Sequence, residues 1–223
     1  MDKFKNKYRI PTNRLKGYDY GAHGLYFVTI CTKEKIHYFG TIVETHDYAS
    51  QNNKSNSLNN CKSNTNNSEP NNHKQIELDN YKQIEPDNHK QIEPDNYLAL
   101  RETEIGKIAR EFWLQIPQHF PFVELDEFIV MPNHVHGILF FNKPNQSDWN
   151  PNTFGKQSQN LASVIRAYKA SVKRFANQNN IEFEWQSRYH DRIIRDFNEF
   201  SNIQEYISNN PQKWANDEYN ITN

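Results

Sequence analysis

The chain is poor in cysteine and in long apolar runs, and each shortage excludes a class of protein. Its 223 residues include only Cys31 and Cys61, with no CxxC pair, so neither a disulfide framework nor a cysteine-ligated zinc site is indicated. No stretch reaches the roughly 18 apolar residues of a membrane span, and the basic N-terminus lacks the apolar segment of a signal peptide. We therefore expect a cytoplasmic protein with no membrane partner.

Excess charge of one sign is also missing from the chain as a whole. The net charge is −1, with 26 basic and 27 acidic residues, so the overall balance predicts no polyanionic partner. The distribution is more informative, because residues 1–16 and residues 151–195 each carry a net charge of +5. Two basic segments fit contacts to a phosphate backbone, although solvated helix faces and a frayed terminus explain them equally well.

Residues 45–97 differ from the rest of the chain in composition. They are rich in Asn, Lys, Ser, Gln and Asp, and residues 73–96 repeat an octapeptide three times, as HKQIELDN, YKQIEPDN and HKQIEPDN. Such a segment cannot bury enough apolar surface to fold, so we predict a disordered insertion at a surface connection, where added length costs little. A second interpretation, with His73 and His89 as metal ligands or the repeats as a docking tail, ranks behind it. Residues 1–44 and 98–223 would then form a single domain.

Outside this insertion, hydrophobic periodicity predicts an α+β fold. The order is β-α-β-β-α-β with one more helix at the end, the split βαβ arrangement of a ferredoxin-like antiparallel sheet. Such a sheet exposes one face, which the last helix can partly cover. The expected strands are residues 24–32 with a continuation at 38–43, 122–130, 134–141 and 189–195, and the expected helices are 102–116 closed by Pro117, 161–175, and 197–209 capped by Asp196.

Two histidines lie one residue apart in the most apolar run of the chain, FIVMPNHVHGILFF at residues 128–141. A strand directs residues i and i+2 to the same face, so His134 and His136 would lie side by side while Val135 points into a core. Two neutral imidazoles on one rigid face can hold a divalent metal. The alternative is the wet face of an edge strand, but the flanking Ile, Leu and Phe favour a buried central strand.

A nucleophile for metal-assisted phosphoryl chemistry can be sought among the 12 tyrosines. If a tyrosine attacks from a helix, a metal ligand four residues later would lie on the same face and couple the nucleophile to the metal. Tyr206 has Asn210 at that position, whereas Tyr168 and Tyr189 have apolar residues there. The alternative is that Tyr206 is a structural aromatic on the inner stripe of the last helix.

These residues belong to a wider pattern that resembles the single-tyrosine transposases with a HUH motif (His, hydrophobic, His), and most closely the REP-associated tyrosine transposases. The pattern spans nearly the whole chain outside residues 45–97, and its ordered set is far more specific than a lone HxH. The matching segments are residues 14–20 (RLKGYDY), 26–32 (YFVTICT), 131–137 (MPNHVHG), 185–186 (WQ), 190–195 (HDRIIR) and 205–211, with Glu205-Tyr206-Ile207 and Asn210-Pro211.

The resemblance implies a transposase-like nickase and strand transferase that acts on single-stranded or hairpin DNA. It implies Tyr206 as the nucleophile, a 5'-phosphotyrosine intermediate, and Mg or Mn held by His134, His136 and Asn210, with no small-molecule cofactor. It favours a nucleoid-associated monomer, although related insertion-sequence transposases are dimers. The basic residues that would contact DNA are Arg14, Lys16, Arg166, Lys169, Lys173, Arg174 and Arg188.

Two other functions stay open. A domesticated relative could grip a nucleic-acid hairpin without cutting it, although His134, His136, Tyr206 and Asn210 are all intact. A metal-dependent phosphodiester hydrolase could use water as the nucleophile and leave Tyr206 in the core. That reaction needs a carboxylate base near the histidines, which the sequence does not obviously provide.

Overall fold

The computed structural model describes residues 3–4, 7–8, 15, 18–45, 97–143 and 159–220. The chain divides into two units, Met1–Val43 with Ala99–Asn223, and Glu44–Leu98. The predicted insertion lies almost wholly outside the described residues, as do Arg14 and Lys16. Among the residues that are described, no helix is long and apolar enough to cross a membrane.

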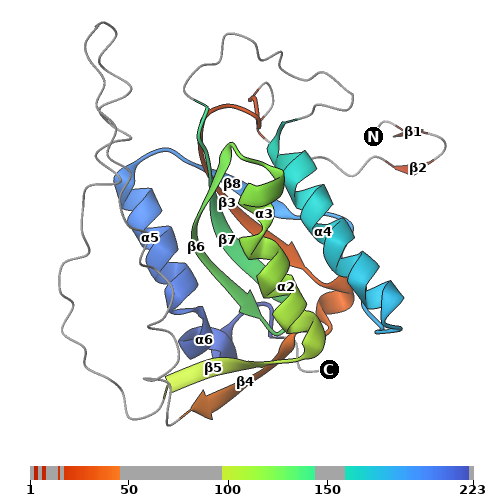
Figure 1. Cartoon of the computed structure of the whole chain (residues 1–223). Helices are drawn as coiled ribbons and strands as arrows, with labels where there is room; N and C mark the ends of the chain where they lie inside the picture. The colour runs from red at the N-terminus through yellow and green to blue at the C-terminus, as the bar shows by residue number, and fades with distance from the viewer. Residues whose placement is uncertain are drawn as a thin grey trace, which may run out of the picture. The chain divides into compact units, whose positions relative to one another are not determined.

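A four-stranded antiparallel sheet forms the centre of the first unit (Figure 1). Its strands are β3 (Gly24–Cys31), β6 (Val123–Met131), β7 (His134–Phe141) and β8 (His190–Ile194), in the spatial order β6-β7-β3-β8. Along the chain the elements run β3-α2-β6-β7-α4-β8. This is the ferredoxin-like order, with the first and third strands in the middle, so the predicted α+β fold class is confirmed.

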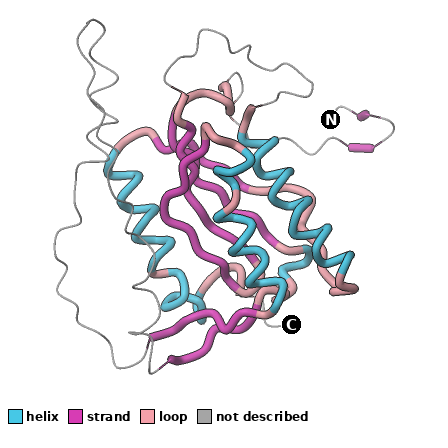
Figure 2. The backbone as a smooth tube through the Cα atoms, viewed as in Figure 1, coloured by secondary structure: helices cyan, strands magenta, loops and turns pink. Residues whose placement is uncertain are grey.

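Helices cover both faces of this sheet (Figures 1 and 2). Helices α2 (Glu104–Leu114) and α4 (Leu161–Gln178) pack together on one face, and α5 (Phe197–Ser208) packs against β6 and β7. The short elements are α3 (Ile116–His119), α6 (Asn210–Lys213), η1 (Lys33–Lys35), η3 (Trp214–Asn216), and two strand pairs, β1 (Lys3–Phe4) with β2 (Lys7–Tyr8) and β4 (Gly40–Thr45) with β5 (Tyr97–Glu102).

Side-chain caps set where the long helices begin. Asp196 accepts a hydrogen bond from the Glu199 amide at the start of α5, as predicted, and Asn160 caps α4 in the same way. The prediction that Pro117 closes the first helix is wrong, because α2 ends earlier, at Leu114. Pro117 lies in the first turn of α3, because proline is tolerated there, where its missing N–H has no intrahelical partner.

The predicted continuation of the first strand at residues 38–43 is also different in the structure. Glu34 and Lys35 adopt positive φ angles of 55°, which turns the chain away from the sheet after β3. The continuation is β4, which pairs with β5 in a separate two-stranded sheet. Strand β5 was not predicted, because it lies next to the polar residues 45–97.

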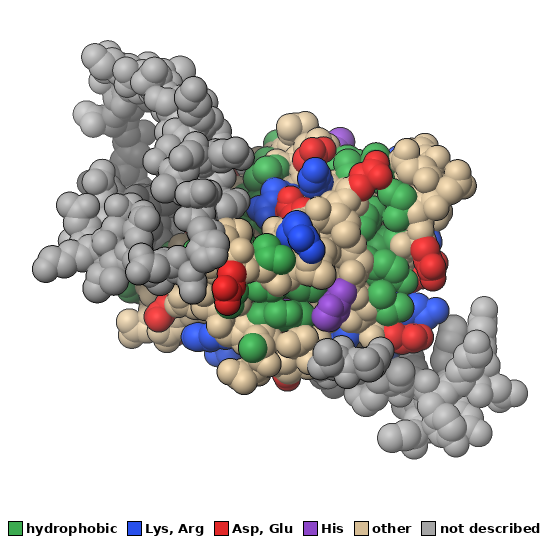
Figure 3. Space-filling view, turned by 90° about the horizontal axis from the view of Figure 1, so that it is seen from below, with side chains coloured by type: hydrophobic (Ala, Val, Ile, Leu, Met, Phe, Trp, Pro, Cys, Tyr) green, Lys and Arg blue, Asp and Glu red, His purple; other side chains and the backbone are tan. Residues whose placement is uncertain are grey.

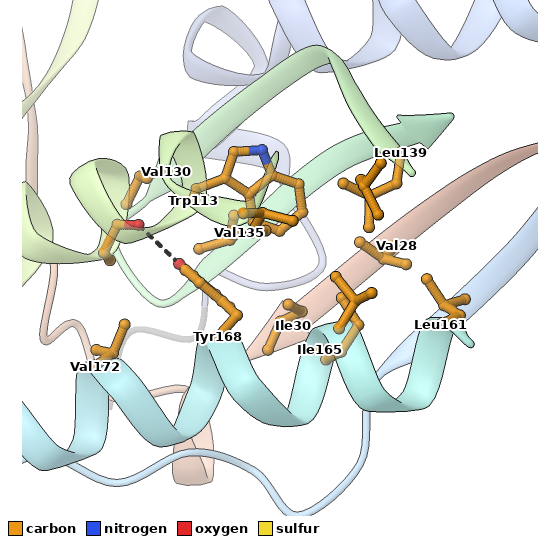
Figure 4. Close-up of a cluster of buried hydrophobic side chains, with 14 of the residues drawn as sticks. Val28, Ile30, Trp113, Val130, Val135, Leu139, Leu161, Ile165, Tyr168 and Val172 are labelled. Atoms are coloured by element: carbon orange, nitrogen blue, oxygen red, sulfur yellow. Dashed lines mark hydrogen bonds between the residues drawn. The ribbon is translucent and has the colours of Figure 1, made fainter. Parts of the chain in front are cut away.

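The main core lies between the sheet and helices α2 and α4 (Figure 4). Val28 of β3 and Val135 of β7 point into it, and Tyr168 of α4 crosses it to donate a hydrogen bond to the Ala109 carbonyl at 3.0 Å. A Cβ at Gly137 would lie 2.3 Å from the Trp113 ring, so this glycine lets the indole pack directly on β7. Since side chains alternate along a strand, the neighbours of Val135 in β7 point to the opposite face.

Candidate active site

His134 and His136 lie on the face of β7 opposite the main core, and both are buried. In the sheet register His134 is opposite Cys31, and His136 is opposite Thr29 of the neighbouring strand β3. Their ring centroids are 4.4 Å apart. The predicted pair of imidazoles side by side on a buried central strand is therefore confirmed, and it lies on the face that α5 covers.

The tautomer of His134 follows from the hydrogen bonds of Asn133. The Asn133 Nδ2 group donates to the carbonyls of Lys35, at 2.9 Å, and Tyr219, at 2.8 Å. Its Oδ1 atom therefore faces His134 Nδ1, 2.9 Å away. An amide oxygen only accepts hydrogen bonds, so His134 carries its proton on Nδ1 and presents a lone pair at Nε2.

His136 lies between a hydroxyl and a phenol. Its Nδ1 atom is 2.9 Å from Thr29 Oγ1, and its Nε2 atom is 3.2 Å from the Tyr206 hydroxyl. With the proton on Nδ1, Thr29 accepts and the phenol donates to Nε2. The Phe27 ring stacks on His136 with centroids 5.4 Å apart. The predicted nucleophile therefore contacts the predicted metal ligand directly.

Both imidazoles are held neutral by their surroundings. Burial lowers the pKa of His136 to about 3. Burial, followed by the nearby His136, lowers the pKa of His134 well below its usual value, although the Asn210 side chain acts in the opposite direction. Neutral imidazoles are the form that binds metal.

Asn210 is brought to the same place by the bend between α5 and α6. Its side chain is buried, and neither Oδ1 nor Nδ2 has a hydrogen-bond partner; His134 Nε2 is likewise buried without one. A buried polar atom without a partner costs about 1–3 kcal/mol, so this concentration indicates a ligand. Among the described residues no group of three His, Cys, Asp or Glu could hold a metal ion, and the role of Asn210 as a third donor stays a prediction.

Tyr206 presents its phenol at the edge of this buried group. The residue is 37% exposed, so part of its side chain lies at the protein surface. Burial, and then the carboxylate of Asp217, raise the pKa of Tyr206, while Asn210 lowers it. The free protein therefore keeps this phenol protonated, and ionisation requires a positive charge nearby.

The C-terminal residues complete the site. The Tyr219 ring lies 4.6 Å from the His134 ring, and the Lys35 ammonium lies 4.6 Å from the Tyr219 ring centroid. Sequence reasoning missed Thr29, Asn133, Lys35 and Tyr219. Thr29 and Asn133 carried a signal, since they lie in the matching segments 26–32 and 131–137, whereas Lys35 and Tyr219 reach the site through tertiary packing alone.

Comparison with known proteins gives a clear relative. An uncharacterized protein of Haemophilus influenzae (strain ATCC 51907 / DSM 11121 / KW20 / Rd) is 30% identical over an alignment of 214 residues, and the match covers 92% of this chain and 89% of the relative. The chain belongs to the family of that protein. No protein-family model matches this chain. A solved REP-associated tyrosine transposase bound to a REP hairpin has a TM-score of 0.43 and 14% identity, over 92% of this chain and 74% of that one.

Arg14 and Lys16 lie outside the described residues, so only five of the basic residues singled out for DNA binding have a described position. Four of them are on α4, which packs on the other face of the sheet. Lys169 donates to the Gln186 carbonyl, and Lys173 donates to the Phe183 carbonyl and pairs with Glu184. Arg166, Arg174 and Arg188 are exposed. Whether any of these side chains contacts DNA stays a prediction.

Proposed function

We propose that this protein is a metal-dependent nickase and strand transferase for single-stranded or hairpin DNA, with Tyr206 as its nucleophile. Two observations at one place carry the proposal. The partly exposed Tyr206 has its hydroxyl 3.2 Å from His136 Nε2. Beside it, His134 Nε2 and both polar side-chain atoms of Asn210 are buried without hydrogen-bond partners. The HUH-like order of motifs in the sequence supports the same reaction.

The residues present fit a divalent cation. His134 Nε2, His136 Nε2 and Asn210 Oδ1 would hold it, and Asn133 and Thr29 would orient the two imidazoles by the bonds to their Nδ1 atoms. Imidazole nitrogens suit transition-metal ions, and the amide oxygen together with water and phosphate oxygens would suit Mn or Mg. When bound, the cation would polarise the phosphate and favour the phenolate of Tyr206.

The remaining chemistry falls to Tyr206. Its oxygen forms a bond to phosphorus while the P–O3' bond breaks, so the 5'-phosphate stays on the tyrosine. The phenolic proton passes to solvent, and the leaving 3'-oxygen takes up a proton to become a hydroxyl. Attack of a 3'-hydroxyl from another strand reverses the step and joins the strands. Because the phosphotyrosine conserves the bond energy, the reaction needs no ATP.

The adduct is the decisive product. We would incubate the protein with a 3'-labelled single-stranded hairpin and Mn, denature it in SDS, and look for labelled protein, since the fragment on the 3' side of the nick stays on the tyrosine. The proposal predicts an adduct in the wild type that Tyr206→Phe abolishes and that Tyr189→Phe, a control phenol on the edge of the core, retains.

Other outcomes identify the alternatives. Cleavage without an adduct, unchanged in Tyr206→Phe, would sink the proposal in favour of a hydrolase. Binding of the hairpin with neither cleavage nor adduct would identify a binding module.

A further inference from the structure

Helix α5 packs mainly on β6 and β7, and the sheet face that bears the histidines continues over β3 and β8. On β3 this face is buried at Thr29 and half-buried at Phe27. Thr29 is paired with His136 on one side and with His190 on the other, and Phe27 is paired with Arg192. Adjacent strands lie about 4.8 Å apart, so His190 follows His136 across the sheet at about 10 Å.

Exposed and core-facing side chains alternate along the edge strand β8 and the residues just before it. Arg188, His190 and Arg192 are exposed, while Tyr189 and Ile193 pack against the main core. We call Arg188, His190 and Arg192 the basic edge. Because of the register with Thr29 and Phe27, the side chains of His190 and Arg192 emerge on the same side of the sheet as the histidine pair, and Arg188 is exposed two residues before His190.

We propose that the basic edge holds the single strand next to the phosphate that Tyr206 attacks, with the half-buried Phe27 ring as the surface between them. This rests on the proposed function and specifies where its substrate lies. Arginine guanidinium groups bind phosphate oxygens through paired hydrogen bonds, an imidazole adds a further donor, and an aromatic face can support a base.

The basic edge stands out because the rest of the chain carries no excess of positive charge. The net charge is −1, and on the face shown in Figure 3 basic and acidic side chains are intermixed. Arg192 pairs with Glu199, yet its side chain keeps 67% exposure, and such surface pairs are worth at most about 1 kcal/mol. An arriving phosphate can therefore replace this partner. By contrast, Lys169 and Lys173 on α4 donate to backbone carbonyls and face away from the site.

The test measures binding without catalysis. A fluorescent single-stranded hairpin is titrated in EDTA with the wild type, with Arg188→Ala/His190→Ala/Arg192→Ala, and with the matched control Arg166→Ala/Arg174→Ala on α4. We expect the basic-edge variant to bind roughly tenfold or more weakly, and its log-log salt slope to shrink by about 1.4, for two arginines on a single strand. Equal loss in the α4 control, or unchanged binding in the basic-edge variant, would overturn the proposal.

Weaker binding by the triple variant could also come from misfolding, so a second variant is chosen that should bind more tightly. Glu199→Gln removes the ion pair with Arg192 but keeps a side chain that can accept the Arg195 amide hydrogen bond at the start of α5. It should bind the hairpin a few-fold more tightly, and unchanged or weaker binding would count against the basic edge.

Failure of this inference and failure of the proposed function are distinguishable. An adduct on Tyr206 with normal binding by the basic-edge variant refutes only the basic edge. Lost binding in that variant, with no adduct in the wild type, refutes only the reaction.

Discussion

Asn133 is the side chain that connects the fold of the hairpin turn to the chemistry of His134. Its amide is held in one orientation by two carbonyls that come from η1 and from the C-terminal residues. The imidazole is therefore locked with its lone pair toward Asn210 before any ligand arrives. Preorganisation of this kind removes the cost of turning the ring when a metal binds.

Replacing this one amide should weaken metal binding while leaving both imidazoles in place. We expect Asn133→Ala to reduce Mn affinity about 10–100-fold, the usual cost of losing such a partner, measured by calorimetric titration. Asn142→Ala, which removes an exposed amide bonded to Glu124, is the control and should bind as the wild type does. Equal affinities for the two variants would contradict the role assigned to Asn133.

The buried imidazoles also make stability depend on pH. Their pKa values are lowered in the folded chain, to about 3 for His136, whereas an unfolded histidine titrates near pH 6.5. Below that pH the two histidines bind protons in the unfolded chain but stay unprotonated in the folded chain. Stability is thus full above about pH 6.5 and falls as the pH drops. His136 accounts for about 2 kcal/mol of this loss between pH 7 and pH 5, and His134 adds to the loss in the same direction.

Urea unfolding in EDTA at pH 7, 6 and 5 measures this loss. His136→Gln should show a shallower decline than the wild type, since one of the buried imidazoles is gone. Burial also lowers the pKa values of His23 and His37, so some decline will persist in the variant. An identical pH dependence in both proteins would show that His136 is not buried in its neutral form.

Helix α5 carries Tyr206, the proposed nucleophile, and its first turn depends on Asp196. The Asp196 side chain accepts from the Glu199 amide at 2.8 Å, just as Asn160 accepts from the Ser163 amide at 3.0 Å at the start of α4. Removing either cap should cost about 0.5–2 kcal/mol. The two helices lie on opposite faces of the sheet, so only one of the caps should affect Tyr206.

This pair makes a matched test of what α5 does. Asp196→Ala and Asn160→Ala should lower the urea midpoint by similar amounts, but only Asp196→Ala should slow formation of the tyrosine adduct at a temperature where both remain folded. Equal adduct rates would mean that the start of α5 does not position Tyr206.

Residues 46–96 connect two strands, β4 and β5, that pair with each other. Thr45 donates a hydrogen bond to the Tyr97 carbonyl at 2.9 Å, so β4 and β5 are already joined where this segment leaves and returns. We predict that replacing residues 46–96 with a four-residue turn raises stability by about 2 kcal/mol through the smaller loop-closure entropy. Hairpin binding and the adduct should be unchanged.

Thermal unfolding and the adduct assay on the shortened chain check this prediction. A large loss of stability would mean that residues 46–96 contribute to the fold, against their composition. Loss of the adduct alone would instead assign them a part in holding DNA.

The sequence by itself determined the features that depend on neighbours along the chain. Alternation placed His134 and His136 on one face of a strand, and a single aspartate marked the start of α5. The i+4 spacing singled out Asn210 as the partner of Tyr206, although α5 ends at Ser208 and Asn210 begins α6. These depend on strand and helix periods and on local caps, which a few consecutive residues encode. For the same reason the β-α-β-β-α-β order follows from hydrophobic periodicity alone.

Only the tertiary structure decided what meets across the fold. The register of β3 against β7 pairs Thr29 with His136, and the packing of α4 on the opposite face separates its basic residues from the site. Tertiary packing also occupies Lys169 and Lys173 with carbonyls, and it brings Tyr219 onto His134. Register and choice of face are set by burial summed over distant segments, so no local pattern reveals them.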